Sequence, residues 1–555
     1  MFQSFHKDFF VDINDDGHGA LSFHVGGNAM KSSMQHQFSQ VPRADIPRSS
    51  FDRSNNFKTT FNAGYLIPVM VDEVYPGDTF NCHMTAFGRL ATPLHPFMDN
   101  MWLDTFFFFV PNRLVWSNWQ RFMGEQANPG DSIDFSIPQV AIPVGGVANG
   151  SLGDYFGLPT QVAAGKTVSA LPFRAHNLIW NQWFRDQNMQ NSVPVPLGDG
   201  PDTYTDYVVK RRGKRHDYFT SALPWPQKGP AVQLPLGSQA PVSGLGVIIN
   251  ATAGASPANT RDNAGFTGVY PNAVSTSAAG TTSVRLKGSA GNWTPDVYAD
   301  LSTATAATIN QLRQSFQIQR LLERDARGGT RYTELLQAHF GVTSPDARLQ
   351  RPEYLGGSSI PLNVNPIAQT SAVPSQPTPT GNLAAMATYH VNTGFTKSFT
   401  EHGYILGYIS ARADLNYQQG LNKMWSRKTR YDFYWPALSH IGEQAILNKE
   451  IYMDGSANDD LVFGYQERWA ELRYKPSLIT GQFRSNFAQT LDTWHLAQNF
   501  GALPTLSSTF IEENPPVARV IAVPSSPAFL FDAYFKLRCA RPLPLYSVPG
   551  FIDHF

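Results

Sequence analysis

Cysteine is nearly absent from this chain of 555 residues, which contains only Cys82 and Cys539. Each lies on the apolar side of an alternating segment, where a small hydrophobic residue would serve as well. The sequence therefore predicts two buried free thiols rather than a disulfide or a metal-binding pair. This usage is typical of synthesis in a reducing cytoplasm and excludes a scaffold held together by disulfides.

Long hydrophobic runs are also lacking. No stretch approaches the roughly eighteen apolar residues of a membrane-spanning helix. Residues 1–19 contain neither the basic region nor the apolar region of a signal peptide. We therefore expect a soluble protein with no membrane insertion and no signal-directed secretion.

Charge is scarce as well. Charged residues make up 15% of the chain, against roughly 25% in average soluble domains, and 43 Lys and Arg balance 43 Asp and Glu. Aromatic residues reach 13%. A neutral, charge-poor and aromatic-rich surface favours association, so we expect an obligate assembly that buries aromatic area between subunits.

Catalytic signatures are missing too. The segment Ala164–Thr167 (AGKT) resembles a phosphate-binding loop, but the glycine needed five positions earlier is replaced by Thr160. Carboxylates near His95 and His18 lack a third ligand at a spacing that enforces metal geometry. No G-x-S-x-G nucleophile elbow occurs. We assign no catalytic, cofactor-binding or metal-binding residue.

The positive signals are short strand patterns. Tyr65–Val74 is rich in β-branched and apolar residues, and Phe80–Ala86 alternates apolar with polar side chains after a Pro-Gly-Asp turn. Trp102–Val110 contains four consecutive phenylalanines, Phe106–Phe109, and does not alternate. A strand of that kind needs protein on both faces, either within the subunit or across a subunit contact.

The end of the chain contains matching patterns. Phe529–Cys539 alternates cleanly, and Tyr404–Leu415 alternates more loosely. Glycine (44) and proline (40) are scattered throughout, as in short strands joined by long loops. Strands at both ends of the chain favour a Greek-key sandwich in which the first and last strands pair.

Helical spacing predicts four insertions, at 112–125, 174–190, 304–327 and 332–340. In the third, we expect Ile309, Leu312, Phe316 and Leu321 to face inward. Two segments differ in composition from their flanks: 237–291 is rich in Ala, Gly, Ser, Thr and Asn, and 363–382 is rich in Pro, Ser and Thr. We predict an exposed, structured insertion for the first and a crossing loop for the second.

A basic cluster is the densest local charge in the chain. It consists of Lys210, Arg211, Arg212, Lys214 and Arg215. With aromatic residues beside it at 218 and 219, it is a candidate for contact with nucleic-acid phosphates and bases. An inter-subunit strip of salt bridges and a solvated edge are the alternatives.

Large aromatic side chains are candidate anchors of a subunit interface. These candidates are Phe106, Phe107, Phe108, Phe109, Trp116, Trp119, Trp180 and Trp183. Each could equally belong to the core, and burial in an isolated subunit decides between the two.

Several long strings match one known family: RSSFDRSNNFKTTFNAGYLIPVMVDEVYPGDTF at 48–80, LIWNQWFRDQN at 178–188, and the segments 211–229, 321–357 and 541–555. Together they resemble the major capsid protein of microviruses, which are small icosahedral phages with single-stranded DNA, and the gokushovirus branch in particular. The resemblance covers nearly the whole chain.

The resemblance implies a mainly β fold: an eight-stranded antiparallel jelly-roll sandwich with long helical and loop insertions. It also divides the chain into 1–47 (N-terminal arm), 48–236 (first jelly-roll strands with helical insertions), 237–291 (variable projecting insertion), 292–402 (helical and loop insertion) and 403–555 (closing strands and C-terminal arm).

The implied function is a shell subunit of the virion, without cofactors, assembled in the cytoplasm of a host bacterium. Implied partners are other copies of the chain, packaged single-stranded DNA, a small basic DNA-packaging protein, a scaffolding protein, a pilot protein and, through 237–291, a host surface receptor. A shell of zero net charge cannot neutralise a genome, which fits the need for a basic partner.

One alternative comes from a different class. A β-sandwich carbohydrate-active enzyme or glycan-binding protein would use the aromatic residues as sugar-stacking platforms. Because the separation of a catalytic carboxylate pair is a three-dimensional property, the sequence neither selects nor excludes such a pair.

Overall fold

The computed structural model describes residues 47–162, 165–232, 309–371 and 380–546, with five short strands between 242 and 299. The chain divides into the units Met1–Pro47 and Arg48–Phe555. The predicted N-terminal arm therefore lies outside the described residues, except for Pro47. All of the architecture below belongs to the second unit.

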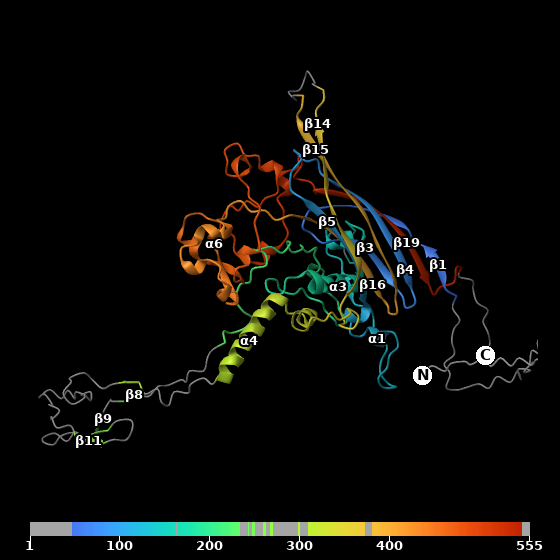
Figure 1. The fold of residues 1–555 in the computed structure, drawn as a ribbon. Helices are drawn as coiled ribbons and strands as arrows, with labels where there is room; N and C mark the ends of the chain where they lie inside the picture. The colour runs from blue at the N-terminus through green and yellow to red at the C-terminus, as the bar shows by residue number, and fades with distance from the viewer. Residues whose placement is uncertain are drawn as a thin grey trace, which may run out of the picture. The chain divides into compact units, whose positions relative to one another are not determined.

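Two antiparallel sheets form the framework (Figure 1). The first contains, in spatial order, β2 (Asn55–Phe61), β19 (Phe529–Arg541), β4 (Thr79–Leu90) and β15 (Leu383–Ser398). The second contains β13 (Glu353–Pro361), β5 (Met101–Pro111), β16 (Gly403–Ala413) and β3 (Ile67–Val74). Successive strands of this framework alternate between the sheets, except that β5 and β13 are neighbours in the second sheet. The last strand, β19, lies between β2 and β4, which is the jelly-roll arrangement. The predicted mainly β antiparallel sandwich is confirmed.

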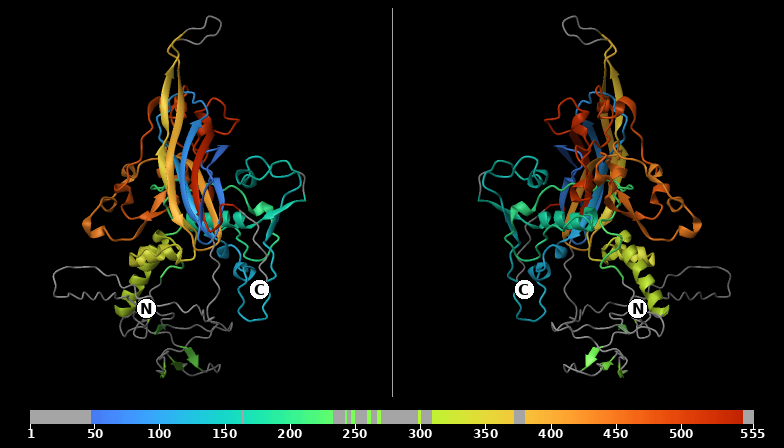
Figure 2. Two further views of the ribbon diagram at one scale, coloured as in Figure 1. Left: turned by 90° about the vertical axis from the view of Figure 1, so that its right-hand side faces the viewer. Right: turned by 90° about the vertical axis from the view of Figure 1, so that its left-hand side faces the viewer.

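Two further strands raise the first sheet to six. β1 (Ser49–Asp52) pairs with the end of β19 beyond β2, so β1 and β2 form one interrupted edge. β14 (Asn363–Ala368) pairs with Leu383–Thr388, the part of β15 that runs past β4. Figure 2 shows this yellow hairpin extending beyond the other strands.

The structure corrects the prediction for 292–402. That segment is not only a helical and loop insertion, because it contains two strands of the sandwich: β13, at the edge of the second sheet, and β15, beside β4 in the first. Asn363–Ala368, expected within a loop, is strand β14. The strand content was hidden by glycine and small polar residues, such as the GGSS sequence inside β13.

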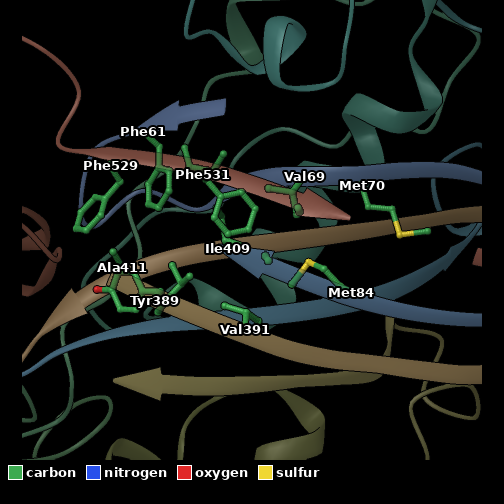
Figure 3. Close-up of a cluster of buried hydrophobic side chains, with 14 of the residues drawn as sticks. Phe61, Val69, Met70, Met84, Tyr389, Val391, Ile409, Ala411, Phe529 and Phe531 are labelled. Atoms are coloured by element: carbon green, nitrogen blue, oxygen red, sulfur yellow. The ribbon is translucent and has the colours of Figure 1, made fainter. Parts of the chain in front are cut away.

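Strict alternation of buried and exposed residues marks two strands of the first sheet. Every second residue of β4 and of β19 is buried, including Cys82 and Cys539, which are free thiols as predicted. Side chains from both sheets meet between the layers, among them Val69, Met84, Tyr389 and Phe531 (Figure 3). Burying one such side chain is worth about 1.5–3 kcal/mol.

β5 shows why the four phenylalanines do not alternate. Phe107 and Phe109 point into the sandwich, where Phe109 lies 4.6 Å from Phe399 between ring centres. Phe108 faces the other way and packs against Trp183 at 5.3 Å. Gly407 on β16 lies opposite Phe107, and a Cβ atom there would approach the Phe107 ring to 2.9 Å. Both faces of the strand are covered by this subunit.

The outer cover is a helical layer. It consists of η1 (Asn112–Leu114), α1 (Trp119–Phe122), α3 (Leu171–Ile179) and the π-helical turn η2 (Trp180–Phe184). The helix expected at 112–125 is therefore reduced to two short turns. Arg174 of α3 anchors this layer: both it and Asp202 are buried, and they form a bidentate ion pair at 2.6 and 2.7 Å.

α4 (Ile309–Gly328) confirms the third predicted helix but corrects its orientation. Ile309, Phe316 and Leu321 are exposed, and Leu312 is half-buried. Within the described part of the chain, only the last turns, around Ala326, pack firmly against other elements. α5 (Tyr332–Leu335) and η4 (Leu336–Phe340) then end at Gly341, as predicted.

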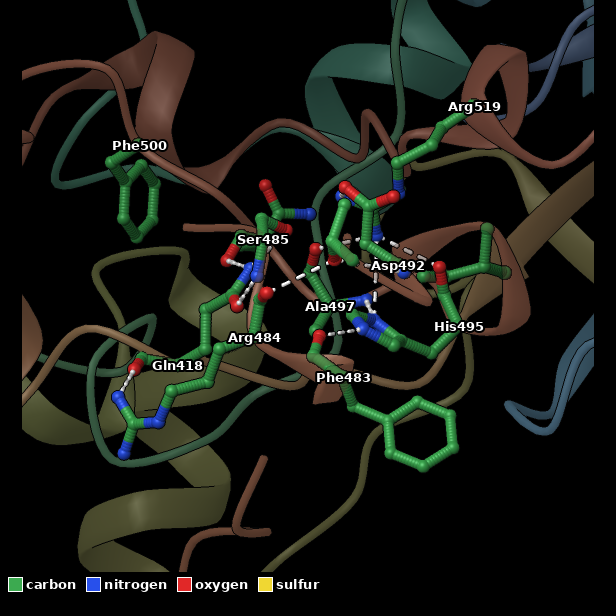
Figure 4. A network of polar contacts seen from close by, with 12 residues as sticks. Gln418, Phe483, Arg484, Ser485, Asp492, His495, Ala497, Phe500 and Arg519 are labelled. Atoms are coloured by element: carbon green, nitrogen blue, oxygen red, sulfur yellow. Dashed lines mark hydrogen bonds and ion pairs between the residues drawn. The ribbon is translucent and has the colours of Figure 1, made fainter. Parts of the chain in front are cut away.

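The segment between β16 and β19 is rich in loops. Polar contacts hold it together: the Gln418 side chain accepts a hydrogen bond from the Ser485 amide at 2.9 Å, and Arg519 donates to the His495 and Ala497 carbonyls at 2.8 and 3.0 Å (Figure 4). Its regular elements are β17 (Glu443–Leu447), α6 (Asn448–Ile451), β18 (Val462–Glu467) and α7 (Ser508–Ile511).

Shorter elements complete the described residues. They are β6 (Gln139–Ala141), α2 (Leu152–Tyr155), β7 (Thr167–Ser169), β8 (Val242–Ser243), β9 (Val247–Ile249), β10 (Asn259–Arg261), β11 (Thr267–Val269) and β12 (Tyr298–Ala299). β9, β10 and β11 pair in one small sheet, and β8 pairs with β12. Most of the predicted projecting insertion, 237–291, lies outside the described residues.

Candidate nucleic-acid and subunit contact sites

The basic cluster is an extended segment held between two parts of the fold. The Leu66 amide donates to the Lys210 carbonyl at 2.9 Å, and the Arg212 amide donates to the Gly64 carbonyl at 2.7 Å. On the other side, the Lys214 amide donates to the Ile511 carbonyl at 2.7 Å. Backbone bonds on both sides therefore fix the direction of each side chain.

Arg212 points into the protein. It forms an ion pair with Asp104 on β5, which also binds Arg412 at 2.6 Å. Its guanidinium lies 4.6 Å from the centre of the Phe106 ring. Burial, and to a lesser extent the neighbouring Arg412, lower the pKa of Arg212 to about 10, although Asp104 opposes the change. Burial alone would raise the pKa of Asp104, but the two guanidinium groups outweigh it and hold that pKa below its usual value.

Lys214 is also buried, with 8% of its surface exposed. Its ammonium lies 4.5 Å from the centre of the Phe510 ring, and burial lowers its pKa while the nearby Glu513 opposes the change. Burial raises the pKa of Glu513 to about 7, against the Ala413 amide and the surrounding cations. Glu513 therefore exchanges a proton near neutrality.

The remaining three cations lie nearer the surface. Arg211 lies 4.2 Å from the centre of the Tyr65 ring and donates to the Glu513 carbonyl at 2.8 Å. Arg215 pairs with Asp414 at 3.0 Å and stacks on an aromatic ring. Lys210 lies 5.8 Å from the centre of the Trp180 ring. The cluster is thus tied into the subunit, an arrangement that none of the sequence interpretations included.

A cavity of about 630 Å³ opens beside this cluster. Its walls include the aromatic side chains of Phe106, Phe108, Trp183, Phe184 and Tyr354. The structure therefore brings together the basic cluster and the phenylalanine run, which are about one hundred residues apart in the sequence.

Charge pairing limits what this cavity can bind. Seven cations line it: Arg185, Arg212, Lys214, Arg215, Arg327, Arg331 and Arg412. Asp186 and Glu334 line it as well. Four further carboxylates interact with those cations, three through ion pairs and one, Glu513, through its charge near Lys214: Asp104, Asp414, Glu443 and Glu513. The formal balance is +1, so most of the positive charge is already compensated within the subunit.

Comparison with known proteins decides the class of this molecule. The family model described as "Capsid protein (F protein)" matches residues 39–551. The chain belongs to this capsid family. The capsid protein VP1 of Bdellovibrio phage phiMH2K is 51% identical, over 94% of this chain and 98% of the relative. The VP1 proteins of Chlamydia phage 1 and Spiroplasma virus 4 are 46% and 38% identical over 94% and 93% of this chain and nearly all of each relative.

Membership of the capsid family establishes the general function of the chain. The chain is a major capsid protein of the virion, with a structural rather than an enzymatic role. The comparisons give no support to a carbohydrate-active enzyme or a glycan-binding protein. Among the described residues, no helix has the length and hydropathy to cross a membrane.

A capsid subunit must present apolar surface to its neighbours, but the predicted interface anchors offer little. Phe107, Phe108, Phe109, Trp116 and Trp180 are at most 5% exposed. Phe106, Trp119 and Trp183 are half-buried and pack against the same cluster as α3. The structure therefore assigns the buried five to the subunit's own core.

An exposed aromatic segment, Met424–Trp435, was not predicted from the sequence. It lies in the loop-rich region and has neither helical nor strand periodicity. Its signal was the interleaving of arginines and lysines with aromatic residues (MWSRKTRYDFYW), a composition typical of interfaces.

Proposed function

We propose that copies of this capsid protein assemble into an icosahedral shell that encloses a single-stranded DNA genome. Membership of the capsid family carries this proposal, and a rigid jelly-roll sandwich with large surface loops supports it. Closed shells require contacts that repeat by symmetry, which one chain type can supply.

The test is to express the full chain and to examine it by sedimentation and negative-stain imaging. Closed particles of uniform diameter are the expected result, and fivefold rings at lower concentration would be their assembly intermediates. A chain that remains monomeric, both alone and with the other proteins of its virus, would refute the shell.

We also propose that the outer members of the basic cluster contact the packaged DNA. Arg215 is 34% exposed in its side chain and Lys210 is half-buried, whereas Arg212 and Lys214 are committed to partners inside the subunit. Arg215 lines the cavity, so a phosphate attracted by it would lie beside the cavity's aromatic rings, on which bases stack.

This contact is tested by Lys210→Gln combined with Arg215→Gln. We expect normal particles containing less DNA, because two phosphate contacts are lost. Unchanged DNA content per particle would refute the contact. The matched control is Arg212→Gln, which should lower subunit stability instead, since it leaves buried Asp104 with one cation fewer.

The other partners remain part of the same proposal. Net charge is zero, so a small basic packaging protein would neutralise the genome. The scaffolding and pilot proteins, and assembly in a bacterial cytoplasm, rest on the family resemblance alone.

Host attachment through 237–291 is a separate part of the proposal. Replacing this segment with a short turn should leave particles that assemble but adsorb poorly to host cells. Failure to assemble would instead show that the segment has an architectural role.

A further inference from the structure

The segment Met424–Trp435 exposes an unusual amount of aromatic surface. Trp425 is 70% exposed, Tyr431 65% and Phe433 54%, and Met424, Tyr434 and Trp435 are also exposed. Large apolar side chains grouped in this way mark a contact site rather than ordinary surface.

The segment is already ordered in the isolated subunit. The Asp432 carboxylate accepts hydrogen bonds from the Lys428 and Thr429 amides at 2.9 and 2.7 Å. The Trp435 indole donates to the Arg430 carbonyl at 3.1 Å, and the Tyr434 ring meets the Trp469 ring edge-on at 5.6 Å. Little ordering entropy remains to be lost on binding, which favours a tight contact.

Its cations favour a protein partner over nucleic acid. Arg427 lies 5.6 Å from the centre of the Phe433 ring and 3.5 Å from Glu471. Arg430 lies 4.9 Å from the centre of the Trp435 ring. Arginines stacked on aromatic rings are typical hot spots of protein interfaces.

The charge of the segment disfavours pairing with itself. Met424–Trp435 contains three cations, Arg427, Lys428 and Arg430, and one carboxylate, Asp432. Arg427 is paired with Glu471, so Lys428 and Arg430 are the exposed cations of the segment. Two such surfaces facing each other across a twofold axis would repel. An acidic and different partner surface is therefore favoured, which makes the contact heterologous, the type that closes rings.

The same chain carries a surface of the required kind. Residues 122–165 contain four carboxylates and neither lysine nor arginine. In the loop after α1, Glu125 and Asp134 are exposed, and Met123 and Ile133 beside them are 48% and 49% exposed. This acidic loop, Met123–Asp134, combines negative charge with apolar contacts.

The two surfaces lie too far apart to meet within one subunit. Figures 1 and 2 show the loop after α1 on the opposite side of the sandwich from the orange region around α6, to which Met424–Trp435 belongs. We propose that Met424–Trp435 of one copy docks on the acidic loop Met123–Asp134 of a neighbouring copy. This inference rests on the proposed shell.

Charge reversal tests the pairing. Lys428→Glu with Arg430→Glu, and separately Glu125→Lys with Asp134→Lys, should each lower particle yield by about tenfold or more, since like charges at a contact cost several kcal/mol. Combining all four substitutions should restore yield to within about twofold. Lys428→Arg with Arg430→Lys keeps the charge and serves as the control with normal yield.

Other outcomes are equally decisive. Normal yield from either reversal overturns the contact while leaving the shell intact. Loss of yield without rescue overturns the pairing of these two surfaces. The unmodified chain must form particles for these comparisons to apply. If it does not, the proposed shell fails, and the proposed contact fails with it.

A second measurement needs no substitution. Hydroxyl-radical labelling of Met424, Trp425 and Met123 should fall severalfold in particles compared with free subunits. Equal labelling in both states would overturn the contact. Melting temperatures of the unassembled variants, expected to match the unmodified chain, show that lost yield is not lost folding.

Discussion

Phe106–Phe109 and Met424–Trp435 are both aromatic-rich, yet they have opposite environments. The first lies in a strand of the second sheet, covered by the first sheet on one face and by the α3 layer on the other. The second lies in a loop with two short helical turns, where its tryptophan, tyrosine and phenylalanine side chains are 42–70% exposed. Composition alone does not distinguish core from interface, because both use the same side chains.

What distinguishes them is the neighbouring residues. The phenylalanine run has β-sheet partners with glycines opposite, at Gly356 and Gly407, which leave room for large rings. The Met424–Trp435 segment has arginines between its rings, which a dry core would not accept. Four substitutions test this contrast by their effects on the unassembled subunit.

The largest effect is expected from Phe108→Ala. It removes a ring that is 1% exposed and leaves a cavity between β5 and η2, so the free energy of unfolding should fall by about 4 kcal/mol. Urea unfolding of the unassembled subunit measures the change. A loss below about 1 kcal/mol would mean that the ring is not core.

The next effect tests the layer that covers Phe108. Asp202→Ala leaves the buried Arg174 guanidinium without its ion pair and removes the partner of Tyr207, so the free energy of unfolding should fall by at least about 3 kcal/mol. Asp532→Ala is the matched control. It breaks an ion pair between two exposed side chains, Asp532 (55% exposed) and Lys58 (68% exposed), so the free energy of unfolding should change by less than about 0.5 kcal/mol. Equal effects would contradict a buried anchor.

A smaller, pH-dependent effect is expected from Glu513. Burial raises its pKa from 4.5 to about 7, so its contribution is present below pH 4.5 and lost as pH rises to 7, by at most about 3 kcal/mol. Glu513→Gln should remove this loss, making the variant progressively more stable than the unmodified chain as pH rises.

His176 changes the free energy of unfolding with pH in the direction opposite to that of Glu513. Burial lowers its pKa to about 3, so its contribution is present above pH 6.5 and lost as the pH falls. In the unmodified chain the two groups partly cancel between pH 4.5 and 6.5. In Glu513→Gln, stability should rise with pH over this range, and a flat profile would contradict the prediction.

These contrasts also show where sequence reasoning works. β4 and β19 alternate strictly because one face is buried and the other exposed, so period-two patterning located both strands and their inward residues. β15 carries a similar pattern from Tyr389 to Phe395, but neighbouring threonines and glycine weakened it and it was missed. β13 offers almost no pattern, since its central residues are glycine and serine.

The site was less predictable, because its partners come from distant parts of the chain. The basic cluster was visible in sequence, but Asp104, Asp414 and Glu513, which neutralise it, lie on three separate segments. The helical spacing of apolar residues predicted α4 correctly. This spacing does not show which turns of the helix are buried, and among the described residues only the last turns pack against other elements. Local patterns determine elements, whereas charge pairing and exposure depend on the assembled fold.

The smallest effect on the isolated subunit is expected from Trp425→Ala. Because the ring is 70% exposed, its loss should change the free energy of unfolding by no more than about 0.5 kcal/mol, although Trp is larger than the Phe removed at position 108. Urea unfolding under the same conditions gives the comparison directly. A loss above about 1.5 kcal/mol would place Trp425 in the core and remove the contrast between the two aromatic segments. A negligible loss of stability accompanied by reduced particle yield would show that its aromatic surface serves assembly rather than folding.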